Sequence, residues 1–340
     1  MNRLMLTESE VGEIQRLTRE IVERFGSSES PGLLAEAAVL AHDLPRRLRY
    51  FLNDFRLQEP EPGICVISGL TVDNDRIGDT PKHWKDRKRP TRTETEEVFL
   101  ILAGSLLGEV IGWATQQAGY IIHEIFPIAG HEKEQLGTGC EELLAWHNED
   151  AFHSCRGDYL GLLCLRNPDG VVTTWGSCDV SLLTPRHRDL LFEPRYTIRP
   201  DESHLQKNSA GPVPNEELSQ SYSQISRMNS VPPRIPVLYG SKERPYLRLD
   251  PYFMDRCPDD PEAQEALDAL IAQIDSRIET VVIGPGDLLI IDNYRVVHGR
   301  KPFKARHDGR DRWLKRINIT RDLRKSRELR GSSESRVLCG

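Results

Sequence analysis

Two histidines and one carboxylate are spaced along the chain as ligands of a single metal ion would be. His147 and Glu149 are separated by one residue. Because alternate side chains of a β-strand face the same side, both can reach one ion. His298 follows a second apolar run, within GPGDLLIIDNYRVVHGR at 284–300. Two imidazoles and one carboxylate from separate strands form a facial set with three open coordination positions, an arrangement typical of non-haem iron(II).

Neither half of this pattern is specific on its own. A single histidine in a strand is more often a hydrogen-bonded core residue than a ligand. The chain also holds a second pair of this kind, His187 and Asp189, in a segment predicted to be helical, where side chains at i and i+2 do not share a face. Two histidines and a carboxylate also suit the zinc ion of a hydrolase, so that alternative stays open.

Two arginines follow the second histidine at strand spacing. Arg312 lies fourteen residues after His298, and Arg316 lies four residues further, within RWLKRINIT. Residues four apart on a strand point to the same side, and a guanidinium group pairs with a carboxylate through two hydrogen bonds. Taken singly, each arginine would be expected as one of many solvated surface charges.

The elements that position these residues change in character along the chain. Helical spacing of apolar residues predicts helices over about 8–25, 31–55 and 93–118, and ICVISGL at 64–70 predicts a buried strand. From about residue 120 the chain turns to short apolar runs bounded by Gly, Pro, Asn or Asp, which are typical of antiparallel strands. Helices over about 260–278 and within SLLTPRHRDLLF interrupt them. The order favours an α+β protein with a jelly-roll or barrel core.

Two polar segments stand apart from this pattern. Residues 201–230 are long, polar and poorly periodic, which favours a loop that acts as a lid. The segment 323–340 is basic and rich in serine, and it is expected to be a mobile tail. The remainder, 1–322, is expected to form a single domain.

The bulk composition excludes several classes of protein. The formal charge is −7, so neither nucleic acid nor an anionic membrane is an expected partner, and no run is long enough to span a bilayer. The first residues lack the apolar stretch of a secretory signal. The seven cysteines are scattered and contain no C-x-x-C pair, which favours reduced thiols in the cytoplasm over disulfides or a structural zinc site. The oligomeric state is left open, a homodimer included.

Three stretches together resemble a known family. AWHNEDAF, LLIIDNYRVVHGRKPF and RHDGRDRWLKR are similar to the corresponding stretches of the clavaminate synthase-like iron(II)/2-oxoglutarate oxygenases. Within that group the chain resembles the arginine, enduracididine, asparagine and lysine hydroxylases of antibiotic pathways. The resemblance, from about residue 60 to 322, implies a double-stranded β-helix core flanked by helices. It also implies Fe(II), 2-oxoglutarate and O2 as cofactors and co-substrates, with His147, Glu149 and His298 as the iron ligands.

The same resemblance implies roles for the residues around the metal. Arg312 corresponds to the arginine that holds the distal carboxylate of 2-oxoglutarate. Thr173 or Thr174 corresponds to a threonine that assists it, and Thr174 is preferred. Arg316 corresponds to an arginine near the substrate carboxylate. Related halogenases replace the carboxylate ligand with a small residue, so the presence of Glu149 favours hydroxylation over halogenation.

For the substrate, the resemblance implies a free amino acid. Gln116, rather than Gln117, matches a glutamine at the end of the third predicted helix that receives the α-amino group, and Glu149 is a second acceptor for it. Asp201 and Ser203 match a D-x-S pattern of a lid that closes over basic amino acids. Asp250 matches an acidic residue that meets the cation of the substrate side chain.

One departure from the family pattern bears on the choice of substrate. Relatives that bind arginine or lysine often have D-x-D, whereas this chain has Asp250-Pro251-Tyr252. The loss of the second carboxylate weakens the case for plain arginine, while a tyrosine can stack on a cyclic guanidine such as that of enduracididine. The expected reaction is hydroxylation at the β-carbon. Attack at another carbon, desaturation, and a non-catalytic jelly-roll binding protein are the alternatives.

Overall fold

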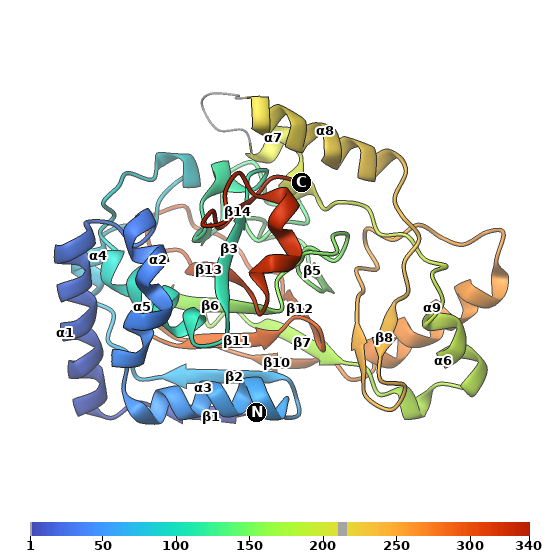
Figure 1. Ribbon diagram of the computed structural model, residues 1–340, viewed down its shortest axis with the longest axis horizontal. Coiled ribbons are helices and arrows are strands. Elements are labelled where there is room, and N and C mark those ends of the chain that lie inside the picture. The colour runs from blue at the N-terminus through green and yellow to red at the C-terminus, as the bar shows by residue number, and fades with distance from the viewer. Residues whose placement is uncertain (1, 210–215) are drawn as a thin grey trace.

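Two facing β-sheets wrapped by helices make up the computed structural model, which describes residues 2–209 and 216–340. The helices of the N-terminal half are α1 (Glu8–Phe25), α2 (Pro31–Leu40), α3 (Arg46–Gln58), α4 (Asn74–Ile77) and α5 (Glu94–Ser105). Those of the C-terminal half are α6 (Pro185–Leu191), α7 (Gln206–Ser209), α8 (Glu216–Ser230) and α9 (Pro261–Asp275). Figure 1 shows α1, α2 and α5 at one end of the molecule and α6 with α9 at the other. The expected α+β class is confirmed.

The larger sheet has eight strands in the order β1-β2-β11-β6-β13-β3-β14, and β4 also pairs with β13. Its strands are β1 (Asn2–Met5), β2 (Ile64–Ser68), β3 (Glu109–Trp113), β4 (His123–Ile125), β6 (Tyr159–Arg166), β11 (Leu288–Asp292), β13 (Trp313–Thr320) and β14 (Val337–Leu338). The smaller sheet runs β10-β7-β12-β5. Its strands are β5 (Leu144–His147), β7 (Thr173–Ser177), β10 (Glu279–Val281) and β12 (Val296–Arg300), and β8 (Leu238–Gly240) pairs with β9 (Pro245–Leu247) separately.

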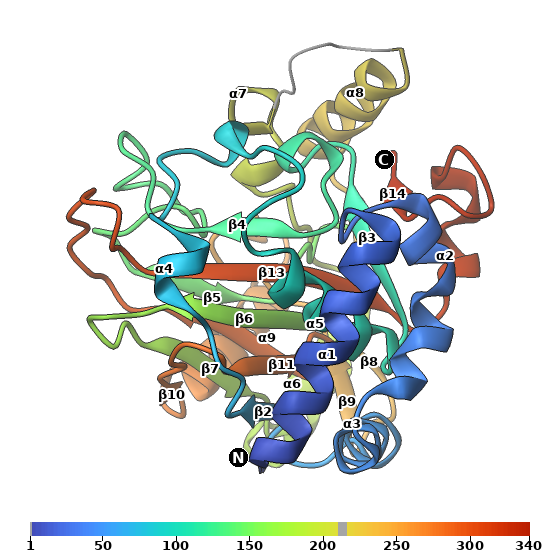
Figure 2. The same cartoon turned by 90° about the vertical axis from the view of Figure 1, so that its left-hand side faces the viewer.

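The side chains of the central strands of the larger sheet alternate between two hydrophobic cores, one on each face of the sheet. In β2, Cys65 and Ile67 pack against the N-terminal helices, whereas Ile64 and Val66 point between the two sheets. The strands β6 and β11 divide their side chains in the same way. Both faces of this sheet are therefore buried, and Figure 2 shows α1 and α5 lying over its outer face. The helices α6 and α9 cover the smaller sheet.

The predicted third helix is too long. Residues 93–118 form α5, which ends at Ser105, followed by the strand β3. An unbroken apolar run does not distinguish a buried helix from a buried strand, and VFLILAGSLLGEVIGWA contains both. The chain turns at Gly108, where a Cβ atom would lie 2.2 Å from the carbonyl oxygen of Thr320 in β13. This close approach lets β3 pair with β13.

Two predictions for polar segments are also wrong in part. Within 201–230, the structure places α7 and α8 where a loop was expected, and 210–215 lie outside the described residues. The helix α8 is polar overall and buries only Ser221 and Ile225, so few apolar residues mark it in the sequence. The tail is not detached: β14 pairs in parallel with β3, and Leu338 is fully buried. The C-terminus lies beside α8 (Figures 1 and 2).

The described helices include none that is long and apolar enough to cross a bilayer. All seven cysteines are free.

Candidate active site

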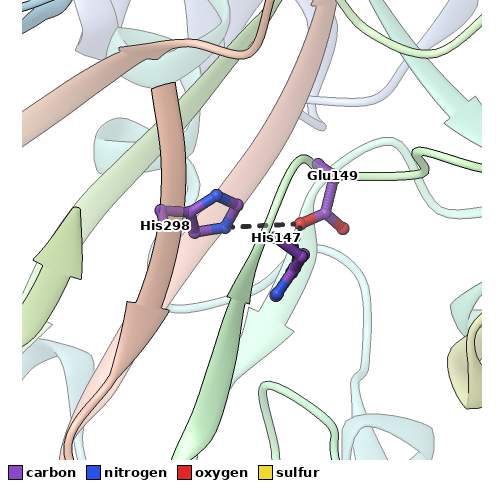
Figure 3. Close-up of side chains that lie close together, drawn as sticks. All are labelled: His147, Glu149 and His298. Atoms are coloured by element: carbon purple, nitrogen blue, oxygen red, sulfur yellow. Dashed lines mark ion pairs between the residues drawn. The ribbon is translucent and has the colours of Figure 1, made fainter. Parts of the chain in front are cut away.

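The three predicted metal ligands meet at the end of β5. His298 of β12 is paired directly with His147 of β5, so the two imidazole rings lie 4.8 Å apart. Glu149 follows β5, and its Oε2 atom lies 3.8 Å from Nε2 of His147 and 3.5 Å from Nε2 of His298. Figure 3 shows the three side chains turned toward one another. One ligand atom from each lies within 4.8 Å of the others, which is compatible with a single shared ion.

Hydrogen bonds orient these ligands. Nδ1 of His147 lies 2.8 Å from the carbonyl oxygen of Ala145, which only accepts, so Nδ1 carries a proton and Nε2 is the nitrogen that faces the other ligands. Asn293, in the turn before β12, accepts from the backbone N–H of Glu149 and donates back to its carbonyl oxygen at 2.7 and 3.0 Å. Asn148 donates to the carbonyl oxygens of Asn293 and Val296. These amides lock β5 and β12 in register.

Charge around Glu149 keeps it ionised. Burial alone would raise the pKa of Glu149, but Arg316 and the two histidines outweigh burial and hold that pKa well below its usual range. Nη1 of Arg316 forms an ion pair with Oε1 of Glu149, while its Nη2 lies 2.7 Å from Nδ1 of His123. A guanidinium only donates, so Nδ1 of His123 accepts. An ionised carboxylate is the form that binds a metal.

A buried guanidinium without a counter-ion lies in the same cavity. Arg312 is 5% exposed, its Nε has no hydrogen-bond partner, and the described residues offer it no ion pair. Burial and, to a smaller extent, nearby Arg300 lower the pKa of Arg312 to about 10. Arg300 itself donates to the carbonyl oxygens of Cys140, Glu142 and Lys301. Because a buried unpaired charge is costly, Arg312 is suited to an incoming carboxylate.

The structure places Thr173, not Thr174, in the wall of this cavity. On β7, Thr174 pairs with Gly299, on the sheet face opposite His298, and its Oγ1 lies 2.9 Å from where a Cβ of Gly299 would stand. Thr173 pairs with Arg300 and faces the other way, with a buried Oγ1 that has no partner. Thr174 therefore faces away from the cavity and Thr173 faces into it, because neighbouring residues of a strand point to opposite faces of the sheet.

Three predicted substrate-binding residues share the cavity with the metal ligands. Asp201, Ser203 and Asp250 line it together with His147, Glu149 and His298. Asp250 is 6% exposed, and burial raises its pKa to about 7, although His147 opposes this shift. Tyr252 is 59% exposed, and its ring contacts Phe253.

Gln116 lines a second cavity, which adjoins the first at Ser203 and Arg316. It lies after β3 and directly before a short 3-10 helix (Gln117–Gly119), not at the end of the long third helix that was expected. Its Nε2 donates to Asp150 and to Ser203, at 3.2 and 2.6 Å. Its Oε1 is buried without a hydrogen-bond partner.

Several residues of the site were missed by sequence reasoning. Asn293 sits in the turn DNYR, and no spacing rule ties it to Glu149. His123 lies beside Arg316, and this pairing follows from the β4–β13 register alone. A second group of potential ligands, Asp150, Asp201 and His204, also escaped notice. Since Nε2 of His204 is already bonded to Asp150 at 3.0 Å, this group is a hydrogen-bonded cluster.

Comparison with known proteins adds the following findings. The model of the family described as "Taurine catabolism dioxygenase TauD, TfdA family" matches residues 91–318. The chain is 44% identical to an L-ornithine/L-arginine 3-hydroxylase of Catenulispora acidiphila, covering 99% of this chain and 100% of the relative. It is 43% identical to an enduracididine beta-hydroxylase of Streptomyces hygroscopicus, with the same coverage.

The solved structures of the non-haem iron oxygenase OrfP are similar throughout. Its complex with Fe, succinate and (3S)-hydroxy-L-Arg matches with a TM-score of 0.95 and 49% identity, over 99% of this chain and 100% of OrfP. Its complex with Fe and alpha-ketoglutaric acid matches with a TM-score of 0.89 and 47% identity, over 99% of each chain. The resemblance expected from the sequence is confirmed.

Substitution of a metal ligand should abolish metal binding. In His147→Ala we expect the affinity for Fe(II), or for Co(II) as an air-stable probe, to fall by more than about 100-fold, because losing a ligand costs more than losing its supporting hydrogen bond. Isothermal titration calorimetry measures this directly. His187→Ala, in the other histidine–acid pair, is the matched control and should bind metal normally. Unchanged affinity in His147→Ala would remove this residue from the metal site.

Proposed function

The chain belongs to the TauD/TfdA family of iron(II)- and 2-oxoglutarate-dependent dioxygenases, and from that premise we propose that it hydroxylates a free, basic L-amino acid at the β-carbon. The observation that carries this proposal is a three-residue metal set placed beside an unpaired, buried guanidinium, in a cavity that also holds two carboxylates. We further propose that its two sheets form the double-stranded β-helix of this family, and that 201–230 acts as a lid.

His147, Glu149 and His298 fit a divalent iron ion. Nε2 is the nitrogen of His147 left for a metal, because Nδ1 donates to a backbone carbonyl, and Glu149 is held ionised by Arg316. Iron(II) and 2-oxoglutarate, once bound, supply the oxidising power: one oxygen atom of O2 enters the substrate C–H bond and the other enters succinate, with release of CO2. The protein's own contribution is to position the reactants and exclude water.

Arg312 and Thr173 fit the distal carboxylate of 2-oxoglutarate. Both present buried donors without a protein partner, and both line the cavity that holds the metal ligands. A carboxylate there would receive two N–H bonds from the guanidinium and one O–H bond from the threonine. Arg300 is less suited to this role because backbone carbonyl groups already occupy its donors. The assignment of the assisting threonine thus moves from Thr174 to Thr173.

The α-amino acid end of the substrate would lie where the two cavities meet. Oε1 of Gln116 is a buried acceptor without a donor, which suits an ammonium group. Glu149 adds a second acceptor for that ammonium. Arg316 borders both cavities and is the cation that a substrate carboxylate would meet, and Ser203 lies beside it in both walls.

The side chain of the substrate would extend toward Asp250 and Asp201. These two carboxylates line the wall, which favours a cationic side chain such as a guanidinium. Arginine and enduracididine are the leading candidates, because relatives with these activities share over 40% identity with this chain. The exposed Tyr252, in place of a second acid, leaves room for a cyclic guanidine to stack on it.

A panel assay tests the proposed function. Protein loaded anaerobically with Fe(II) and 2-oxoglutarate is exposed to O2 with arginine, enduracididine, ornithine, lysine, citrulline or asparagine. We expect succinate formation coupled to the gain of one oxygen atom with a guanidino amino acid. Loss of two hydrogens instead would indicate desaturation. No coupled succinate with any member would contradict the proposed function.

The pKa of Asp250 predicts how affinity depends on pH. Burial raises this pKa to about 7, so Asp250 is mostly neutral at pH 6 and mostly charged at pH 8. Arginine should therefore bind about tenfold more tightly at pH 8 than at pH 6. Citrulline, which has the same shape without the charge, should show little change. The dependence should vanish in Asp250→Asn, and its persistence there would remove Asp250 from the pocket.

A further inference from the structure

Asp150 directly follows the metal ligand Glu149, yet its side chain lies in the wall of neither cavity. Its backbone adopts a φ of 52°, in the left-handed region that non-glycine residues rarely occupy. This conformation turns the chain immediately after the ligand. The Asp150 carboxylate is 2% exposed and lies in the interior between β3, β13 and the segment 201–209.

Four donors from three parts of the chain converge on this carboxylate. Oδ2 accepts from Nε1 of Trp113 at 2.6 Å and from Nδ2 of Asn318 at 3.1 Å. Oδ1 lies 3.0 Å from Nε2 of His204 and accepts from Nε2 of Gln116 at 3.2 Å. Trp113 and Asn318 belong to the larger sheet, whereas His204 belongs to the segment proposed as the lid. Asp150 therefore joins a fixed element to that segment.

The same contacts determine which way the Gln116 amide faces. One N–H of its Nε2 donates to Asp150, and the other donates to Oγ of Ser203 at 2.6 Å. A reversed amide would lose the bond to Asp150, because its Oε1 cannot donate to that carboxylate, whereas the Ser203 hydroxyl could bond to either end of the amide. Its Oε1 is thereby fixed as the free end, buried and without a donor. A fixed acceptor favours an ammonium group over any ligand that cannot donate.

Ser203 and His204 are neighbours in the chain, so one segment provides both contacts. His204 is fully buried: Nδ1 lies 2.8 Å from Oγ1 of Thr115, and its ring packs against Trp113 and Phe152. Asp150, Gln116, Ser203 and His204 thus form a closed circuit of contacts. If the segment moved away, Gln116 would lose Ser203, and Asp150 would lose His204.

We propose that Asp150 and His204 are positioning residues that hold the carbonyl oxygen of Gln116 toward the substrate ammonium group, so that recognition of a free amino acid depends on docking of the segment 201–209. The inference rests on the proposed function, because it requires a substrate with a free α-amino group. Neither residue touches the substrate. Both act through the orientation of Gln116.

Two ligands that differ only in the α-amino group distinguish this positioning role from a general effect on the structure. The dissociation constants of arginine and of its des-amino analogue, 5-guanidinopentanoate, are measured anaerobically on protein loaded with Fe(II) and 2-oxoglutarate. In His204→Phe, which keeps an aromatic ring but has no N–H, arginine should bind at least tenfold more weakly, and the analogue less than threefold. The affinity for 2-oxoglutarate should not change. His204→Gln, which restores an N–H, should recover most of the loss for arginine.

His153→Phe is the matched control, because the His153 ring packs on the same Trp113 and Phe152 rings but makes no hydrogen bond to the Asp150 carboxylate; the bond from its backbone N–H to the Asp150 carbonyl oxygen is kept in the variant. It should affect both ligands equally. If His204→Phe also weakens both ligands equally, the inference is wrong while the proposed function stands. If the wild-type protein binds no amino acid of the panel, the proposed function fails, and the inference fails with it.

Hydrogen exchange, measured without ligand, tests separately whether His204 docks the segment 201–209. Hydrogen exchange of the backbone amides in 201–209 should be faster in His204→Phe than in the wild type, and unchanged in His153→Phe. Equal exchange in the wild type and His204→Phe would show that His204 does not dock the segment, whatever the substrate.

Discussion

The register between β5 and β12 is the constraint on which the site depends. It sets His298 opposite His147, and a shift of one residue would turn one imidazole to the far side of the sheet. Two buried amides hold this register: Asn148 bonds to the chain on either side of the turn before β12, and Asn293 bonds in return to the backbone of Glu149. The proposed metal ligands are therefore positioned by backbone contacts of their own neighbours, and a metal ion need not assemble them.

Strand β13 and the residue before it carry three cations, of which Lys315 and Arg312 are buried and Arg316 is partly buried. Lys315 faces the N-terminal helices and is fully buried, with ion pairs to Glu97 and Glu124 that compensate its charge. Arg312 and Arg316 point to the opposite side, into the cavity. Arg316 has Glu149 as a partner, but Arg312 has none among the described residues. Burial of an unpaired charge costs on the order of several kcal/mol, and a bound carboxylate would offset that cost.

Sequence patterns predicted the parts of the site that depend on local spacing. The i and i+2 ligands and the arginines four residues apart follow from local spacing, although Glu149 lies just beyond β5 and Arg312 just before β13; α9 follows from its helical periodicity. The failures occurred where contacts between distant segments decide the structure. The helix–strand boundary at Gly108 depends on β13, β14 is held by β3, and the choice between Thr173 and Thr174 depends on the register with β12. Asp150 and His204 meet only after folding, and their sequence neighbourhoods give no sign of it.

The central claim is that Arg312 is kept unpaired for the carboxylate of 2-oxoglutarate. The most direct test is an anaerobic titration of 2-oxoglutarate into Fe(II)-loaded protein, followed by the visible absorption that arises when an α-keto acid chelates iron. Arg312→Met should weaken binding by about 30-fold or more, since losing one partner of a buried charged pair costs about 2–5 kcal/mol and each 1.4 kcal/mol is about tenfold. Arg310→Met, which removes an exposed guanidinium two residues away, should bind normally. Equal affinity in Arg312→Met and the wild type would contradict the account.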